Sequence, residues 1–103
     1  MELGLRDRIA LVTGAGSGIG RAIALSLAAE GVHLVATDVR AETAAATAAA
    51  ATACGSEALG VSLDVTNYEQ AQAVVQHAIQ RFGRLDIVVN CAGAWRVNLL
   101  VDS

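Results

Sequence analysis

The stretch TGAGSGIG, residues 13–20, directly follows the apolar run IALV, residues 9–12. The apolar run contains β-branched residues and predicts a buried strand. The alternating glycines predict a turn whose backbone can take positive φ and approach a ligand closely. A helix is expected next, ended by Gly31. The residues that recur at helical spacing in it are Ile19, Ala22, Ile23, Ser26 and Leu27. Strand, glycine turn and helix in this order indicate a phosphate-binding loop, because the first N–H groups of the helix face the anion.

The spacing of the glycines distinguishes three kinds of phosphate loop. A P-loop requires a lysine, and the chain contains none. The common dinucleotide motif Gly-x-Gly-x-x-Gly would need glycine at position 19 or 21, where Ile19 and Arg21 stand. The sequence fits T-G-x-x-x-G-x-G instead, with Gly16 interpreted as a permissive extra glycine. A glycine-rich turn without a ligand is the simpler alternative for the motif alone.

The remainder of the chain alternates strand and helix. Apolar runs at 33–37, 58–63 and 87–89 predict three further strands. The alanine-rich residues 41–53 predict a helix with a thin, smooth face, and a flexible alanine linker is the alternative.

The last helix is expected to have one buried stripe and clear ends. Thr66 and Glu69 form a candidate capping box at its start, and Gly83 closes it. The stripe consists of Ala71, Val74, Val75, Ala78, Ile79 and Phe82.

This alternation predicts an α/β fold of the doubly wound, Rossmann type. The expected sheet is parallel, with about four strands in the order 3-2-1-4 and three helices. We expect residues 1–93 to form a half domain of this type and residues 94–103 to be a divergent tail. The strand predicted at 87–89 would be an exposed apolar edge of the sheet. We therefore expect the chain to be marginally stable and to self-associate or to pair with a full-length relative.

Composition narrows the function classes. The chain has 103 residues, a formal net charge of −3 and no cluster of basic residues, which argues against partners such as nucleic acid or an anionic membrane. Cys54 and Cys91 lie far apart without metal-ligand spacing, so neither a metal site nor a disulfide is expected. With no disulfide expected, a reducing cytoplasm is the default location. The N-terminus does not resemble a signal peptide, and no uncharged stretch is long and apolar enough to span a membrane.

In a doubly wound fold, ligands bind beyond the carboxyl ends of the strands. Asp38 follows the second strand and can accept hydrogen bonds from both hydroxyls of an adenosine ribose. Asp64 follows the third and can bond an adenine amino group. Asn90 follows the fourth and can tie neighbouring strand ends together. Asp64 and Asn90 taken singly are more often turn residues than ligand contacts, but unusual residues at all four strand ends together make coincidence improbable.

The preferred cofactor follows from charge. Asp38 would repel a 2′-phosphate, and Ser17 stands in the glycine loop where a basic residue could be. Arg40 lies nearby but two positions further on. NAD is therefore favoured over NADP, and a surface aspartate that caps the next helix is the alternative for Asp38.

Three segments together resemble the short-chain dehydrogenase/reductase family. TGAGSGIG resembles its glycine motif and LDV its adenine-contacting segment. RFGRLDIVVNCAG is similar to its fourth-strand segment, with Cys91 in place of the second Asn of Asn-Asn-Ala-Gly. The resemblance covers residues 7–93 and implies a nicotinamide dinucleotide and hydride transfer at an alcohol or carbonyl carbon. The cofactor-binding residues expected are Gly14, Ser17, Gly18, Ile19, Gly20, Asp38, Asp64, Val65, Asn90, Ala92 and Gly93.

The catalytic residues of that family have no counterpart here. Its Ser and its Tyr-x-x-x-Lys pair lie beyond Asn-Ala-Gly, whereas the single tyrosine, Tyr68, is followed four positions later by Gln72. Asn98 resembles a family asparagine only weakly. His77 is interpreted as a solvated side chain and Cys91 as a small packed residue, and His33 opens a strand at the far end from the cofactor. We therefore expect the cofactor-binding part of an oxidoreductase, inactive alone. A non-catalytic nucleotide-binding or regulatory module and a nonfunctional fragment are the alternatives.

Overall fold

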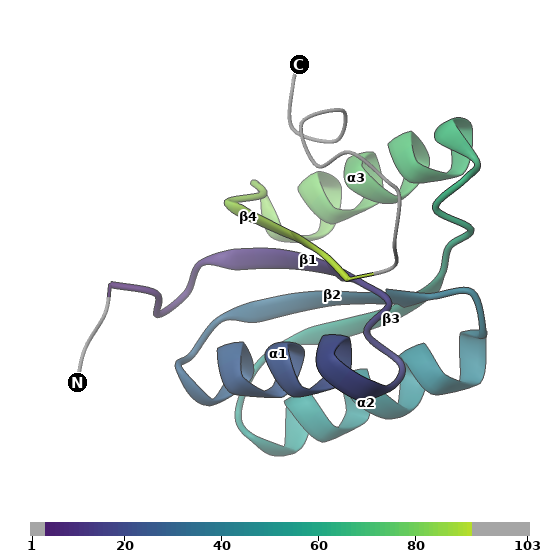
Figure 1. Ribbon diagram of the computed structural model, residues 1–103. Coiled ribbons are helices and arrows are strands. Elements are labelled where there is room, and N and C mark those ends of the chain that lie inside the picture. The colour runs from purple at the N-terminus through teal and green to yellow at the C-terminus, as the bar shows by residue number, and fades with distance from the viewer. Residues whose placement is uncertain (1–3, 92–103) are drawn as a thin grey trace.

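The computed structural model describes residues 4–91 and confirms the predicted order of elements (Figure 1). Every strand ends within one residue of its predicted end, and the alanine-rich segment is a helix rather than a linker. The elements are β1 (Ile9–Thr13), α1 (Gly18–Ala29), β2 (His33–Asp38), α2 (Ala41–Ala53), β3 (Ala58–Ser62), α3 (Tyr68–Phe82) and β4 (Ile87–Asn90).

The four strands described form one parallel sheet in the predicted order β3-β2-β1-β4. Val12 of β1 lies beside Ala36 of β2 on one side and Val89 of β4 on the other. Helices α1 and α2 cover one face of the sheet and α3 lies against the opposite face (Figure 1). The carboxyl ends of all four strands therefore meet at one edge of the domain.

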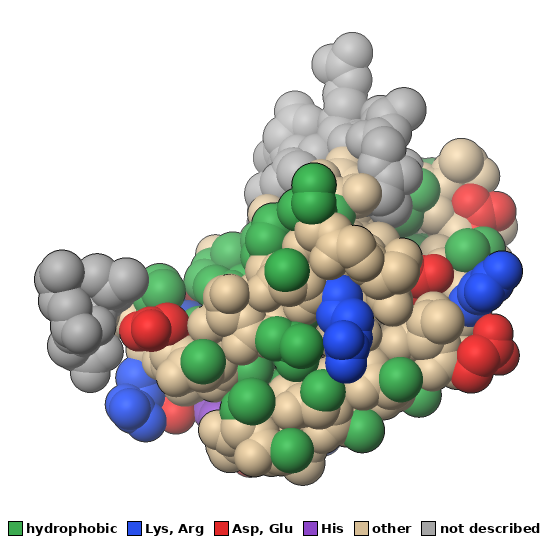
Figure 2. Space-filling model, turned by 60° about the horizontal axis from the view of Figure 1, so that its bottom comes forward, with side chains coloured by type: hydrophobic (Ala, Val, Ile, Leu, Met, Phe, Trp, Pro, Cys, Tyr) green, Lys and Arg blue, Asp and Glu red, His purple; other side chains and the backbone are tan. Residues whose placement is uncertain are grey.

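Two apolar clusters, one on each face of the sheet, form the core. The first is built mostly from small side chains of β1, β2, α1 and α2, among them Ala10, Val12, Ala24, Leu34 and Ala51. The second joins α3 to the other face through Leu11, Val35, Leu63, Ala71, Val74 and Ala78. On the outer side of α1 and α2, hydrophobic side chains are spread among neutral groups with few charges between them (Figure 2).

The smooth face predicted for α2 is confirmed at its contact with β3. A Cβ atom added to Gly60 would stand 2.7 Å from the carbonyl oxygen of Ala44 and from the backbone nitrogen of Ala45. The backbone of α2 thus lies directly on β3, an approach that larger side chains would prevent. This close packing also brings the first two turns of α2 near the glycine loop.

The helix predicted after the glycine turn is confirmed as α1, but the residues at helical spacing do not mark its most buried line. The buried residues are Gly20, Ala24 and Ala28, spaced four apart, whereas Ile19 is 76% exposed. Small residues on one line let the helix approach the sheet, and the larger Ile23 and Leu27 flank this line half-buried. Ile19 belongs to the first turn of the helix, next to the glycine loop.

The start predicted for α3 is also wrong, while its end is confirmed. The N-cap is Asn67, whose Oδ1 accepts a hydrogen bond from the Gln70 N–H at 3.0 Å, so no capping box forms from Thr66. Gly83 ends the helix in the left-handed conformation, with φ of 90°. The buried residues are Ala71, Val74 and Ala78, whereas Ile79 of the predicted stripe is 44% exposed because it lies one position round from this line.

None of the helices in residues 4–91 combines the length and the apolar character needed to cross a bilayer.

Candidate functional site

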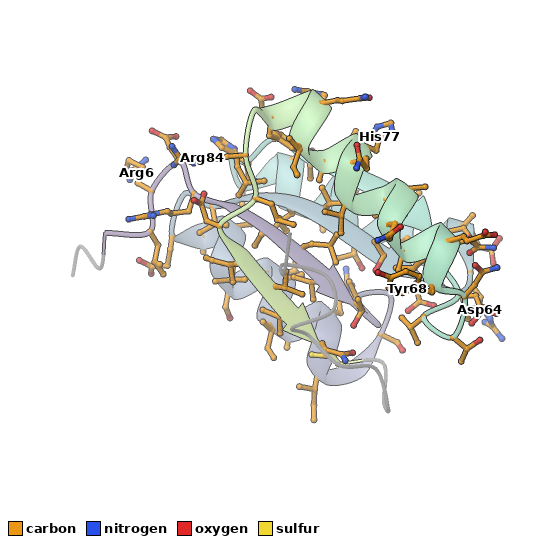
Figure 3. All side chains as sticks on the ribbon, turned by 90° about the horizontal axis from the view of Figure 1, so that it is seen from above. Arg6, Asp64, Tyr68, His77 and Arg84 are labelled. Atoms are coloured by element: carbon orange, nitrogen blue, oxygen red, sulfur yellow. The ribbon has the colours of Figure 1, made fainter. Side chains whose placement is uncertain are left out.

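A cleft of about 170 Å³ lies at the carboxyl ends of the strands. It brings together three segments that are far apart in the sequence: the glycine loop, the end of β2 and the segment after β3. The lining residues are Gly14, Asp38, Val39, Leu63, Asp64 and Val65. Seen from above, Asp64 and Tyr68 lie at the opposite end of the domain from Arg6 and Arg84 (Figure 3).

The glycine loop is tightly turned and pressed against α1. Gly14 and Gly18 have φ of 63° and 58°, in the region that favours glycine. A Cβ atom on Gly20 would overlap the carbonyl oxygen of Gly14 and stand 2.7 Å from its carbonyl carbon. The three glycines of the motif are therefore required by backbone conformation or by close approach.

The start of α1 has the features of an anion-binding helix end. Ser17 is the N-cap, in an extended conformation, and its side chain makes no capping hydrogen bond. The N–H groups of the first turn therefore receive no acceptor from Ser17, and they carry the positive end of the helix dipole. No acidic side chain lies in this first turn to compete with a bound anion. This arrangement fits a phosphate group.

The carboxylate of Asp38 is held by backbone N–H groups on two sides. Its Oδ2 accepts from the Gly16 N–H at 2.9 Å, and its Oδ1 accepts from the Arg40 N–H at 3.2 Å. The interpretation of Gly16 as a permissive extra is wrong: a Cβ there would overlap Oγ1 of Thr43 and stand 2.7 Å from Asp38 Oδ2. Glycine at position 16 thus permits the contact that orients Asp38.

Asp64 lies on the other wall of the cleft. One oxygen of its carboxylate accepts hydrogen bonds from both the hydroxyl and the N–H of Thr66, at 2.6 and 2.9 Å. These two hydrogen bonds, the hydroxyl first, hold the pKa of Asp64 below its ordinary value. They also turn the Thr66 hydroxyl toward Asp64, and the side chain of the next residue, Asn67, caps α3.

Asn90 ties the ends of two strands together, as expected. Its Oδ1 accepts a hydrogen bond from the buried hydroxyl of Thr13 at 2.8 Å. The same hydroxyl accepts from the N–H of Cys91 at 3.1 Å, which fixes the point where the chain leaves β4. The remaining residues of this group, Ala92 and Gly93, and also Asn98, lie outside the residues that the structure describes.

The other candidates lie away from this cleft. His33 opens β2 at the amino ends of the strands, where it bonds Asp7 at 3.1 Å and stacks on Phe82. A second, larger hollow at this end has ionic groups that are already paired, including Arg81 with Glu57 at 3.0 Å. His77 is exposed on α3, and Cys54 is exposed beyond α2. Within residues 4–91, no three His, Cys, Asp or Glu side chains gather as metal ligands would.

Several residues near the cleft are not evident from the motifs. Val39 lines the cleft and is 69% exposed, whereas Leu63 lines the cleft and is buried. The hydroxyl of Thr37 bonds the carbonyl of Val12, and that of Thr47 bonds the carbonyl of Ala15. A threonine within an otherwise apolar run is the sequence signal for such buried hydroxyls, because each must find an acceptor close by.

The chain matches known proteins along almost its whole length. The family model described as short chain dehydrogenase matches residues 8–101. The chain is 43% identical over 96 residues to the short-chain reductase protein NovJ of Streptomyces niveus, covering 93% of this chain and 37% of that one. It is also 43% identical over 99 residues to 3-oxoacyl-(acyl-carrier-protein) reductase FabG of Pseudomonas aeruginosa, covering 96% of this chain and 40% of that one.

The solved structures agree with the sequence matches. A crystal structure of hydroxysteroid dehydrogenase from Escherichia coli superposes with a TM-score of 0.83 and 34% identity, covering 87% of this chain and 38% of that one. This chain thus spans about two fifths of the length of these relatives. The family match, the sheet order and the glycine loop beside Asp38 agree, and the chain belongs to the short-chain dehydrogenase family.

Proposed function

We propose that this chain forms the dinucleotide-binding part of an NAD-dependent short-chain oxidoreductase. The observation that carries the proposal is the Asp38 carboxylate, which the Gly16 N–H holds at the cleft that Gly14 and Asp64 also line. Bound NAD would supply the hydride acceptor for oxidation of an alcohol carbon, or the donor in its reduced form.

Each part of the cleft has a role in this proposal. The first N–H groups of α1, at Gly18 and Ile19, would bind the pyrophosphate. Asp38 would accept hydrogen bonds from the adenosine ribose hydroxyls, and Asp64 would bond the adenine amino group. Val65, on the same wall, would contact the base.

Two further features support NAD over NADP. The Asp38 carboxylate is ordered by two N–H donors, so a 2′-phosphate on the ribose would meet a fixed negative charge. Arg40 is exposed and lies two positions after Asp38 rather than in the glycine loop, and its backbone N–H donates to the Asp38 carboxylate.

The test is calorimetric titration of NAD and NADP into the wild-type chain and two variants. Asp38→Asn removes a charged acceptor from hydrogen bonds worth about 1.5–3 kcal/mol, so NAD affinity should fall about 10- to 100-fold. Its NADP affinity should rise relative to that for NAD. The matched control is Glu42→Gln, which removes an exposed carboxylate in the first turn of α2. Equal affinities for both cofactors in wild type and Asp38→Asn would refute the assignment.

The chain is proposed to bind cofactor without turning over substrate by itself. It contains no lysine, and Tyr68, its single tyrosine, accepts a hydrogen bond from Gln72 at the exposed start of α3. A nucleotide-binding module without catalysis is the alternative, since the same cleft would support it. Turnover of any secondary alcohol by the purified chain would contradict the proposal of inactivity.

Location and association stay predictions. The cytoplasmic location is inferred from cysteine usage alone. Among the described strands, β4 pairs only with β1 and lies at one edge of the sheet, which favours self-association. Sedimentation velocity over a range of concentrations measures this directly, and a concentration-independent monomer would contradict it.

A further inference from the structure

We propose that Thr47 of α2 is a positioning residue for nucleotide recognition, acting through one peptide unit of the glycine loop. This inference rests on the proposed function and names a residue from a helix that the glycine motif does not include. The inference rests on two contacts of the peptide unit between residues 15 and 16: the Thr47 hydroxyl bonds its carbonyl oxygen, and the Asp38 carboxylate bonds its N–H.

The two contacts belong to the same rigid group. The Thr47 hydroxyl donates to the carbonyl oxygen of Ala15 at 2.8 Å, and the Gly16 N–H donates to Asp38 Oδ2 at 2.9 Å. The Ala15 carbonyl and the Gly16 N–H form a single planar peptide unit, so the orientation of one fixes the orientation of the other. Thr47 therefore acts on the N–H that holds Asp38.

Few other groups fix this peptide. The N–H of Ala15 bonds the carbonyl of Thr37 at 2.8 Å, which anchors the chain just before it. Glycine at position 16 leaves the backbone after it free to rotate. A rotated 15–16 peptide would remove the N–H from Asp38, and the carboxylate would keep only the 3.2 Å contact with the Arg40 N–H.

Burial makes the loss of the Thr47 hydrogen bond costly. Thr47 and Ala15 are both fully buried, so water cannot replace the hydroxyl if it is removed. The buried line of α2, Ala44, Thr47, Ala48 and Ala51, is otherwise alanine. Thr47 is therefore the polar member of this line, placed where α2 passes the loop.

The consequence is specific to the ribose. Asp38 is the group proposed to separate NAD from NADP, so loosening its carboxylate should reduce discrimination between them. If Thr47 had only a structural role, removing its hydroxyl would weaken the binding of both cofactors to the same extent. Thr47 is then a determinant of cofactor choice that lies outside the glycine motif in the sequence and acts on it through the Ala15 carbonyl.

The experiment compares Thr47→Val, Thr47→Ser and Thr52→Val in the 103-residue chain. Valine keeps the shape and removes the hydroxyl, and serine restores the donor. Thr52→Val is the control, because its hydroxyl bonds only the Ala48 carbonyl of its own helix. NAD and NADP affinities are measured by calorimetry, and exchange of the Gly16 amide hydrogen by NMR.

We expect Thr47→Val to bind NAD about tenfold more weakly while its NADP affinity changes little. Exchange of the Gly16 amide should quicken, Thr47→Ser should restore both readouts, and Thr52→Val should match wild type. Unchanged discrimination and unchanged Gly16 exchange in Thr47→Val would overturn the role of Thr47 while the proposed function stands. If Thr47→Val weakened the binding of NAD and NADP equally, Thr47 would have only a structural role and the proposal would be overturned. Failure of the folded wild type to bind NAD would overturn both proposals.

Discussion

Replacing Gly20 with alanine should destabilise the chain, although alanine is the better helix former. By helix propensity alone, the change would stabilise α1 by about 1 kcal/mol. A Cβ atom at this position, however, would overlap the carbonyl oxygen of Gly14 and stand 2.7 Å from its carbonyl carbon and 3.3 Å from the Cα of Ala15. All three atoms belong to the backbone, so relief requires the loop and the helix to separate.

The magnitude follows from two opposing contributions. Overpacking costs about 1–3 kcal/mol, and the upper end applies because no side chain can rotate away. The gain in propensity offsets about 1 kcal/mol, which leaves a net loss of about 2 kcal/mol in the free energy of unfolding. For a domain of this size, that loss lowers Tm by about 8–16 °C.

Urea unfolding followed by circular dichroism measures the effect, with Ala22→Gly as the matched control. Ala22 is exposed in the same helix, so its replacement should cost only the propensity difference of about 1 kcal/mol. Displacing the loop should also weaken NAD binding in Gly20→Ala but not in Ala22→Gly. A Gly20→Ala chain as stable as wild type, with unchanged NAD affinity, would refute the close-approach argument.

Two further predictions concern stability. Burial opposes ionisation of Asp86, but hydrogen bonds from the Ile9 N–H and from Arg84 outweigh this effect and lower the pKa of Asp86 below its ordinary value. The ionised carboxylate therefore stabilises the fold at pH values above the ordinary pKa of an aspartate. This contribution is lost as the pH falls through the lowered pKa. The difference in the free energy of unfolding between wild type and Asp86→Asn should therefore shrink on acidification. A difference in urea unfolding that does not depend on pH would contradict this prediction. Gly60→Ala should lower the free energy of unfolding by about 1–3 kcal/mol, because its Cβ would meet the backbone of α2; an unchanged urea midpoint would contradict this.

The order of elements was accessible from the sequence because its signals are local. Hydrophobic runs, helical spacing and closing glycines such as Gly83 each act within a few residues, and alternation of strand and helix leaves few topologies open. The positions of Asp38 and Asp64 at the cleft, and of Asn90 at the end of β4, were accessible for the same reason, since each directly follows or ends an apolar run.

The parts that were missed depend on contacts between distant elements. The close approach at Gly16 involves the side chains of Thr43 and Asp38, which meet the loop only after α2 has folded back. The buried face of α1 consists of small residues that let the helix approach the sheet closely. Hydrophobic periodicity instead favours large side chains such as Ile19, which is exposed. Asn67 rather than Thr66 caps α3, while the Thr66 hydroxyl donates to Asp64 in the preceding turn.

The most direct test of the central claim is amide NMR of the chain during titration with NAD. The account predicts that the signals of Gly18, Ile19, Asp38 and Val65 shift together and saturate, while those of His33 and Glu57 at the opposite end of the strands stay in place. No shift at millimolar NAD in the folded chain, or shifts confined to the end around His33, would contradict it.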